Sequence, residues 1–344
     1  MFLRKLFIAA AAVASITTSA SLFAADAEYT FKLHHFLPPM SMQHSKVFLP
    51  WSEKIAAESN GRIKIELYPT MQLGGKPPHL YDQVRKGVVD MSWTVGGYTP
   101  GRFPKTTVFE LPFMATNAKG MSMALQEFYE SELKDEFEDV HVLSLHTHAR
   151  GVLHSRDTPI SKMEDLQGLK TRAPNKMMAE ALELMGANPV FMPVPQMPSA
   201  LSKGVLNVAV LPYEVIKPLK IHQLVKYHTE FPGERGFYAQ FFIFSMNKDA
   251  YNSLPDDLKA VIDNNSGMEL TAHIGQMFDE NELVGREAAV ENGNTFIELD
   301  EAEIQRIKEK VQPVTDSWIK DHENGQALYD KANELINKYS AQAM

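Results

Sequence analysis

The chain has 344 residues, 44% of them hydrophobic, a formal net charge of −9 at pH 7 and no cysteine. The lack of cysteine excludes thiol catalysis, iron–sulfur clusters and cysteine-bound zinc, and the negative charge disfavours binding to nucleic acid. The composition is that of an ordinary globular protein, and the length suffices for two lobes with separate cores.

The amino-terminal residues have the pattern of a secretory signal. Arg4 and Lys5 precede an apolar stretch at 6–13, and the small residues that follow end in an Ala-x-Ala cleavage pattern at 25–27. A membrane anchor is the alternative, but about 20 apolar residues are needed to span a bilayer, and this stretch is shorter. We therefore expect residues 1–27 to be removed on export and the mature protein to lie in the periplasm.

The first half of the mature chain alternates short apolar strands with helices, which indicates an α/β fold. Strands are expected at 31–36, 63–67 and 88–94. Between them lie a helix at 43–59, with apolar residues at helical spacing, and a helix at 77–87, which opens with two prolines and ends at a glycine.

A second block has a similar order of elements. We expect a helix capped by Asn175 and ending at Met185, an extended segment at 190–192, a short helix at 199–203 and a strand at 206–210. The similarity of the two blocks favours two lobes built in the same way.

Two segments are candidates for the connections between the lobes. One is the strand 142–147, which leads into Arg150 and Gly151, and the other is the return through 232–233 into the apolar strand 237–246. Repeated crossings between lobes form a hinge, and a hinge creates a cleft that can close on a ligand.

These crossings divide the chain into two discontinuous lobes. We predict that the first lobe contains 28–149 and about 236–280, and that the second contains 150–235 and about 281–344. Beyond Gly267 the pattern is mainly helical to the end of the chain.

Motifs of common enzymes are absent from the sequence, including the G-x-S-x-G elbow, phosphate-binding glycine loops and H-E-x-x-H. His146 and His148 share a strand face and could both bind a metal, but no acidic residue has the spacing of a third ligand, so we expect no metal site. Contacts from His34, His35 and His148 to a bound anion are the favoured interpretation, because strand ends face the cleft in such sheets.

Arg172 is the leading candidate for anion binding. It ends a probable strand at 169–172, and Pro174 prevents that strand from continuing. A guanidinium facing the cleft would offer a carboxylate a planar, two-pronged donor, and its loss would little affect folding. The alternative is a surface arginine paired with Asp165 or Glu180.

Several sequence blocks resemble the solute receptors of TRAP (tripartite ATP-independent periplasmic) transporters. They are DLQGLKTRAPN, LMGANPVFMPV and LSKGVLNVAV, together with SNGRIKIELYPTMQLGG, FELPFM and FFIFSMNKDAYNSLP. The resemblance implies a periplasmic binding protein of the Venus-flytrap, type II-like class, with hinge strands and long carboxyl-terminal helices. It also implies a membrane permease with small and large subunits, and uptake driven by an ion gradient.

The resemblance also implies roles for individual residues. The arginine of the L-K-x-R-x-P block, here Arg172, grips the ligand carboxylate in that family. Many members have a second arginine near the start of the second lobe, but Arg150 is not a clean match. The segment 210–214 is apolar and aromatic where an acidic residue and an asparagine are common, which argues against carrying over specificity for sialic acid, sugar acids or C4-dicarboxylates.

One arginine with several aromatic faces suits a monocarboxylate whose body is apolar or aromatic. Aromatic residues occur near the expected strand ends, although each could also be an ordinary core residue. The predicted ligand-binding residues are Arg172, His34, His35, Tyr98, His148, Arg150, Leu211, Tyr213, Phe237 and Tyr238, with Phe103 as a further aromatic candidate.

The sequence thus predicts a receptor, not an enzyme, for a small organic monocarboxylate, with aromatic acids as the leading subclass. We expect no cofactor, no nucleic-acid partner and a monomer. A receptor for a dicarboxylate or keto acid is the alternative, which would need Arg150 or a histidine as a second anion contact. An extracytoplasmic enzyme on the same fold is a more remote alternative.

Overall fold

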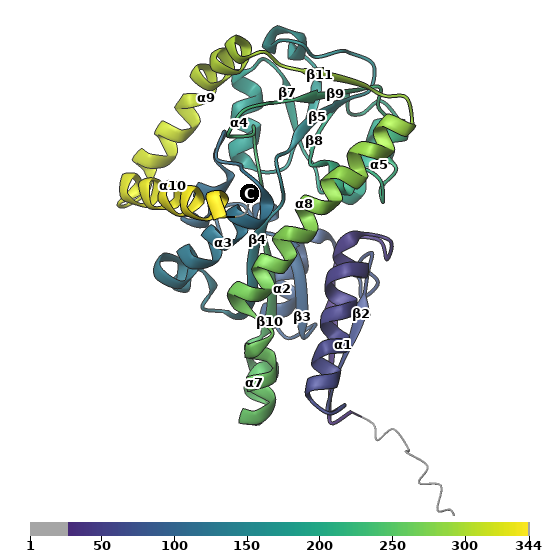
Figure 1. Ribbon diagram of the computed structural model, residues 1–344, viewed down its shortest axis with the longest axis vertical. Helices are drawn as coiled ribbons and strands as arrows, with labels where there is room; N and C mark the ends of the chain where they lie inside the picture. Colours follow the sequence, from purple (N-terminus) through teal and green to yellow (C-terminus); the bar gives the residue numbers. More distant parts are fainter. Residues whose placement is uncertain (1–26, 343–344) are drawn as a thin grey trace, which may run out of the picture.

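The computed structural model describes residues 27–342, so the predicted signal sequence lies outside the described residues apart from Ala27. In this part of the chain no helix is long and apolar enough to cross a membrane. Figure 1 shows two lobes, each built around one β-sheet, and the long helix α8 (Gly267–Glu291), which runs along both. The predicted two-lobe α/β fold with long carboxyl-terminal helices is confirmed.

The sheet of the first lobe has the strand order β2-β1-β3-β10-β4. β1 pairs in parallel with β2 and β3, whereas β10 runs antiparallel to β3 and β4. The strands are β1 (Tyr29–His34), β2 (Ile63–Tyr68), β3 (Met91–Val95), β4 (Val140–Thr147) and β10 (Phe241–Asn247). The helices of this lobe are α1 (Leu49–Glu58), α2 (Leu80–Arg85), α3 (Ala118–Phe128), α6 (Lys248–Asn252) and α7 (Asp256–Asn264).

Two strands of this sheet begin later than the sequence predicts. β3 starts at Met91 because Val88 and Val89 both donate backbone hydrogen bonds to the carbonyl of Gln83, which keeps them in the turn after α2. β10 starts at Phe241 because the residues before it belong to the connection between the lobes.

The sheet of the second lobe has the order β11-β9-β5-β8-β6-β7. Its strands are β5 (Val152–Ser155), β6 (Lys170–Ala173), β7 (Asn188–Phe191), β8 (Val208–Leu211), β9 (Tyr227–Glu230) and β11 (Thr295–Glu298), and its helices include α4 (Lys176–Leu184) and α5 (Met197–Ser202). α4 begins as predicted, because the side chain of Asn175 accepts a hydrogen bond from the backbone N–H of Met178 at 2.8 Å.

The chain passes from β4 to β5 and returns from β9 to β10, and these two connections lie against each other. Gly151 on the outgoing connection donates a 2.9 Å backbone hydrogen bond to Tyr238 on the return. A side chain at Gly151 would place its Cβ 1.8 Å from the ring of Tyr238. The missing side chain therefore allows the two connections to touch and fixes Tyr238 between the lobes.

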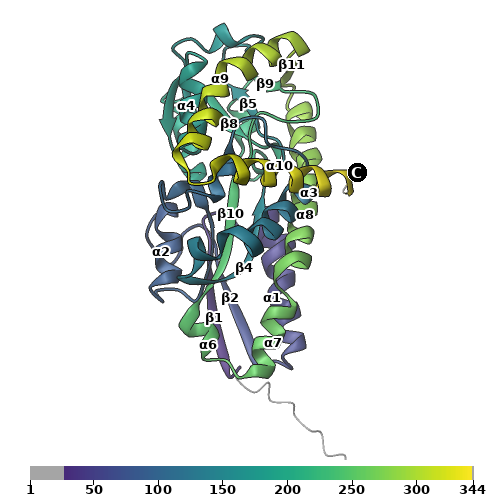
Figure 2. The ribbon, with the colours of Figure 1, turned by 90° about the vertical axis from the view of Figure 1, so that its left-hand side faces the viewer.

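Helix α8 runs along both lobes (Figure 2). Two glycines allow this close contact. A Cβ at Gly275 would lie 2.6 Å from the Cα of Lys119 in the first lobe, and a Cβ at Gly285 would lie 1.9 Å from the carbonyl oxygen of Tyr213 in the second.

The last two helices, α9 (Glu301–Asp321) and α10 (Gly325–Gln342), pack on different lobes. α9 contacts α4 of the second lobe, whereas α10 packs against α3 of the first, where Lys338 makes a 2.7 Å ion pair with Glu127. Assigning all of 281–344 to the second lobe is therefore wrong for α10. The physical reason is the close approach at Gly120, where a Cβ would lie 2.6 Å from the Cα of Ser340.

Candidate functional site

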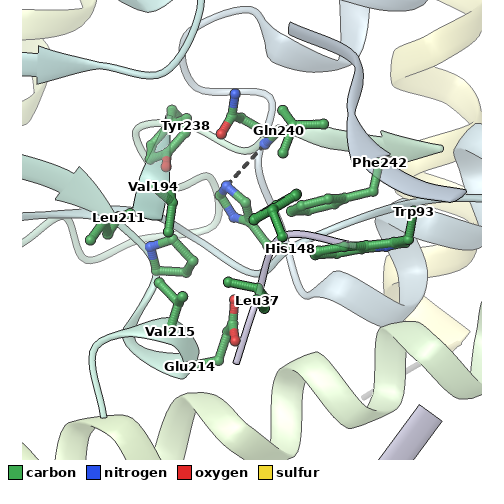
Figure 3. Close-up of a pocket in the computed structure, with 13 residues that line it drawn as sticks. Leu37, Trp93, His148, Val194, Leu211, Glu214, Val215, Tyr238, Gln240 and Phe242 are labelled. Atoms are coloured by element: carbon green, nitrogen blue, oxygen red, sulfur yellow. Dashed lines mark hydrogen bonds between the residues drawn. The ribbon is translucent and has the colours of Figure 1, made fainter. Parts of the chain in front are cut away.

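A cavity of about 320 Å³ lies between the two sheets (Figure 3). Both lobes contribute to its wall, which is mostly apolar and aromatic. The lining residues are Phe36, Leu37, Trp93, Val95, His148, Val194, Leu211, Pro212, Glu214, Val215, Tyr238, Gln240 and Phe242. A mostly apolar cavity between two lobes is a common place for a small-molecule site.

Three aromatic rings of the first lobe form one wall of this cavity. The ring of Trp93 on β3 lies 4.8 Å from that of Phe242 on β10, with 6° between their planes, and 5.0 Å from that of Phe36. The Trp93 Nε1 donates a 2.9 Å hydrogen bond to Nε2 of His146, which fixes the indole. The wall offers a flat apolar face on which an aromatic ligand can stack.

Arg172 lies on β6 and is fully buried. Its Nε donates to the carbonyl of Met192 at 2.9 Å and its Nη1 to the carbonyl of Val210 at 2.8 Å. Within residues 27–342, its Nη2 has no hydrogen-bonding partner. Arg172 does not itself line the cavity. Val194 and Leu211 line it, and they are close in sequence to Met192 and Val210, whose carbonyls Arg172 binds. The guanidinium is therefore held in place with one nitrogen still able to bind an anion.

Two tyrosines lie near this guanidinium. Burial raises the pKa of the Tyr98 phenol, and the Arg172 charge partly opposes the rise. Tyr238, which lines the cavity, donates a 3.2 Å hydrogen bond to the carbonyl of Val210, the same oxygen that Arg172 binds. Arg172, Tyr98 and Tyr238, all predicted from the sequence, are thus brought together.

His148 lines the cavity but carries no charge. Its Nδ1 bonds to the carbonyl of Ala149, and its Nε2 accepts a 3.1 Å hydrogen bond from the backbone N–H of Gln240. Burial lowers the pKa of His148 to about 3. Because both nitrogens are engaged and the ring is neutral at pH 7, His148 presents ring atoms to a ligand and not a cation.

The structure does not place His34, His35 or Arg150 on the cavity. The Nδ1 of His34 lies 2.8 Å from the side-chain oxygen of Gln83, and the Nε2 of His35 lies 3.0 Å from Nδ1 of His44. Arg150 donates its guanidinium hydrogen bonds to backbone carbonyls of the return connection, at Gly233 and Glu234. All three occupy strand ends or the hinge as expected, and each already binds a protein group, although the buried Nδ1 of His35 has no partner among residues 27–342.

Three predicted aromatic residues likewise lie elsewhere. Tyr213 donates to Glu230 at 2.8 Å, Phe237 stacks on Phe231 with ring centroids 4.7 Å apart, and Phe103 stacks on Phe137. Of the remaining candidates, Leu211 lines the cavity. In the described part of the chain, no group of three or more acidic or histidine side chains is arranged to hold a metal ion.

Tyr98 joins the two lobes across the cleft, because its hydroxyl accepts a 2.9 Å hydrogen bond from the backbone N–H of Val194. Tyr98→Phe would leave that N–H unpaired when the lobes are held together as in this structure. We expect ligand affinity to fall by about 3- to 10-fold, the equivalent of one neutral hydrogen bond. Calorimetric titration measures the change. As a control, Tyr251→Phe removes a hydroxyl that binds Asp263 within the first lobe, and equal affinities of the two variants would contradict this role.

The family model described as DctP, bacterial extracellular solute-binding protein, family 7, matches residues 33–321. Outer membrane transporter protein TsaT of Comamonas testosteroni is 27% identical over 321 residues, which are 91% of this chain and 91% of that protein.

Two solved structures are similar over almost their whole length. A marine metagenome TRAP solute-binding protein specific for aromatic acid ligands, in complex with metahydroxyphenylacetate, is 44% identical, with a TM-score of 0.89 over 90% of this chain and 99% of that chain. A TRAP solute-binding protein from Rhodoferax ferrireducens T118, in complex with copurified benzoate, is 42% identical, with a TM-score of 0.89 over 92% of this chain and 99% of that chain.

Proposed function

Because the chain belongs to bacterial extracellular solute-binding protein family 7, we propose that it binds an aromatic monocarboxylate in the cavity between its lobes. The chain is a TRAP-type receptor for a small organic carboxylate. In the proposed complex the ligand carboxylate accepts hydrogen bonds from Arg172, and the ring stacks on the wall formed by Phe36, Trp93 and Phe242.

The observation that carries this proposal is the pairing of one preoriented cation with an aromatic wall. Nη2 of Arg172 has no partner within residues 27–342, and the guanidinium shares the Val210 carbonyl with Tyr238, which lines the cavity. The second candidate cation, Arg150, is engaged by the hinge carbonyls. A dicarboxylate would need a second positive partner, and the lining residues include none, with His148 neutral. The similar structures with benzoate and metahydroxyphenylacetate support the same class of ligand.

We further propose that the protein works in the periplasm and delivers its ligand to a membrane permease of small and large subunits. The extracellular solute-binding family supports the location, and the TRAP receptors among the similar structures support the partner. In this proposal the role is binding and delivery without catalysis.

A thermal-shift panel tests the ligand class. We expect benzoate, phenylacetate and mandelate to stabilise the protein, by about 2.7 kcal/mol at 100 times the dissociation constant. Succinate and galactonate should give no shift in the unfolding temperature. Stabilisation by succinate or galactonate but not by the aromatic acids would contradict the proposal.

Small-angle scattering tests the closure of the lobes. The radius of gyration should be smaller with a stabilising acid bound, because the lobes close on it.

A further inference from the structure

Glu214 lies at the end of the cavity away from Tyr238 and Gln240 (Figure 3). It belongs to a short turn, Tyr213–Val215, that directly follows β8 and Pro212. The carboxylate of Glu282 on α8 accepts backbone hydrogen bonds from Tyr213 at 3.1 Å and from Glu214 at 2.9 Å. The backbone of Glu214 is therefore held in place by helix α8, independently of any ligand.

The Glu214 side chain is only partly paired with protein. Gln43 of the first lobe donates its side-chain N–H to Oε2 of Glu214 at 3.1 Å. Within residues 27–342, the buried Oε1 of Gln43 has no hydrogen-bonding partner, and the Gln43 bond engages only Oε2 of Glu214. Glu214 lines the cavity and Gln43 lies directly behind it, so the acceptor of Glu214 that this bond leaves unengaged borders the cavity, while the unpaired acceptor of Gln43 is buried next to it. A buried polar group normally has a partner.

The chemistry of this end of the cavity favours a hydroxyl group. Carboxyl and amide oxygens accept hydrogen bonds, and a hydroxyl is a donor that brings no charge into an apolar cavity. A second ligand carboxylate would face the like charge of Glu214. Burial also raises the pKa of Glu214 to about 7, partly opposed by the Gln43 hydrogen bond, which makes the carboxyl a poorer partner for an ammonium group.

We propose that Glu214 and Gln43 form a subsite that binds a hydroxyl group on the ring of an aromatic acid, at the end of the ligand away from its carboxylate. This rests on the proposed function, since Arg172 must hold the carboxylate at the other end. The subsite makes hydroxylated aromatic acids the preferred ligands, because a site built to bind a hydroxyl discriminates against analogues that lack it.

Pairs of ligands with nearly equal shape isolate the hydroxyl. Affinities of the wild-type protein for 3- and 4-hydroxybenzoate are compared by calorimetry with those for 3- and 4-methylbenzoate. We expect at least one hydroxybenzoate to bind at least tenfold more tightly than its methyl counterpart. In Glu214→Met, which keeps the length of the side chain but removes its acceptors, that ratio should fall below threefold. Gln43→Leu should lower the ratio too and serves as the second variant.

Tyr213→Phe is the matched control, because it removes a polar atom from the neighbouring residue outside the cavity. Its ratio should equal that of the wild type. Two results would overturn the subsite and leave the proposed function standing. In the first, the wild-type protein binds benzoate but prefers each hydroxybenzoate to its methyl counterpart by less than threefold. In the second, this preference is the same in Glu214→Met and Gln43→Leu as in the wild type. If no benzoate derivative binds the wild-type protein, the proposed function fails and the subsite fails with it.

Discussion

Arg172→Ala should weaken the binding of benzoate by more than about a hundredfold. A hydrogen bond to a charged group contributes roughly 1.5–3 kcal/mol, and the two N–H groups of the unpaired Nη2 can make two such bonds to a carboxylate. A loss of about 3 kcal/mol corresponds to a factor of more than one hundred in the dissociation constant. Arg172→Lys keeps the charge but not the planar donor, so it should recover only part of the affinity. Calorimetric titration measures both.

The same substitution should also lower stability, which corrects the sequence-based expectation that folding would be little affected. Arg172 is fully buried and binds the carbonyls of Met192 and Val210. Its removal leaves the Met192 carbonyl without this donor, at a cost of about 1–3 kcal/mol in the free energy of unfolding. Urea unfolding measures this loss separately from binding.

Arg150→Ala is the matched control for Arg172→Ala. Arg150 is also an arginine that binds two backbone carbonyls between the lobes, but it lies outside the cavity. Its loss should change affinity by less than about threefold. If Arg172→Ala binds benzoate within threefold of the wild type, the carboxylate is held elsewhere.

Trp93→Ala should lower the free energy of unfolding by about 3–5 kcal/mol, the usual range for truncating a large buried aromatic side chain. Trp93 is 1% exposed and contacts Phe36 and Phe242 on its faces. Its removal also leaves Nε2 of His146 without the indole donor. Denaturant unfolding measures the loss, and ligand affinity should fall as well because the aromatic wall is broken.

Trp93→Phe separates the two contributions. The smaller ring retains an aromatic face in the wall but loses the hydrogen bond to His146, so its destabilisation should be clearly smaller than that of Trp93→Ala. A loss below about 1 kcal/mol in Trp93→Ala would show that the wall is not a packed part of the protein.

The order of the strands and helices follows from local patterns, and for that reason the sequence predicts most of it. Alternating apolar residues gave β2, and the cap at Asn175 marked the start of α4. The packing of α10 on α3 has no such local signal. It depends on a close approach between Gly120 and Ser340, more than 200 residues apart in the chain.

The candidate site was predictable in its polar part. Arg172 has a recognisable sequence context, and a strand-end position led to His148. The same reasoning named His34 and His35, which do not line the cavity, because a sequence does not show which protein groups already bind a side chain.

The aromatic wall was missed for a different reason. Trp93 and Phe242 lie inside predicted strands, where a residue facing the cavity and a residue of the core have the same pattern. Phe36 follows directly after His34 and His35. The signal in the sequence was that three large aromatic residues fall on or next to three strands. These strands, β1, β3 and β10, are neighbours in the sheet of the first lobe.

A crystal structure of the protein with bound benzoate tests the central claim most directly. We expect the ligand between the lobes, with a carboxylate oxygen within hydrogen-bonding distance of Nη2 of Arg172 and the ring stacked on the wall of Phe36, Trp93 and Phe242. A carboxylate bound to other groups, with Nη2 of Arg172 still without a partner, would contradict it.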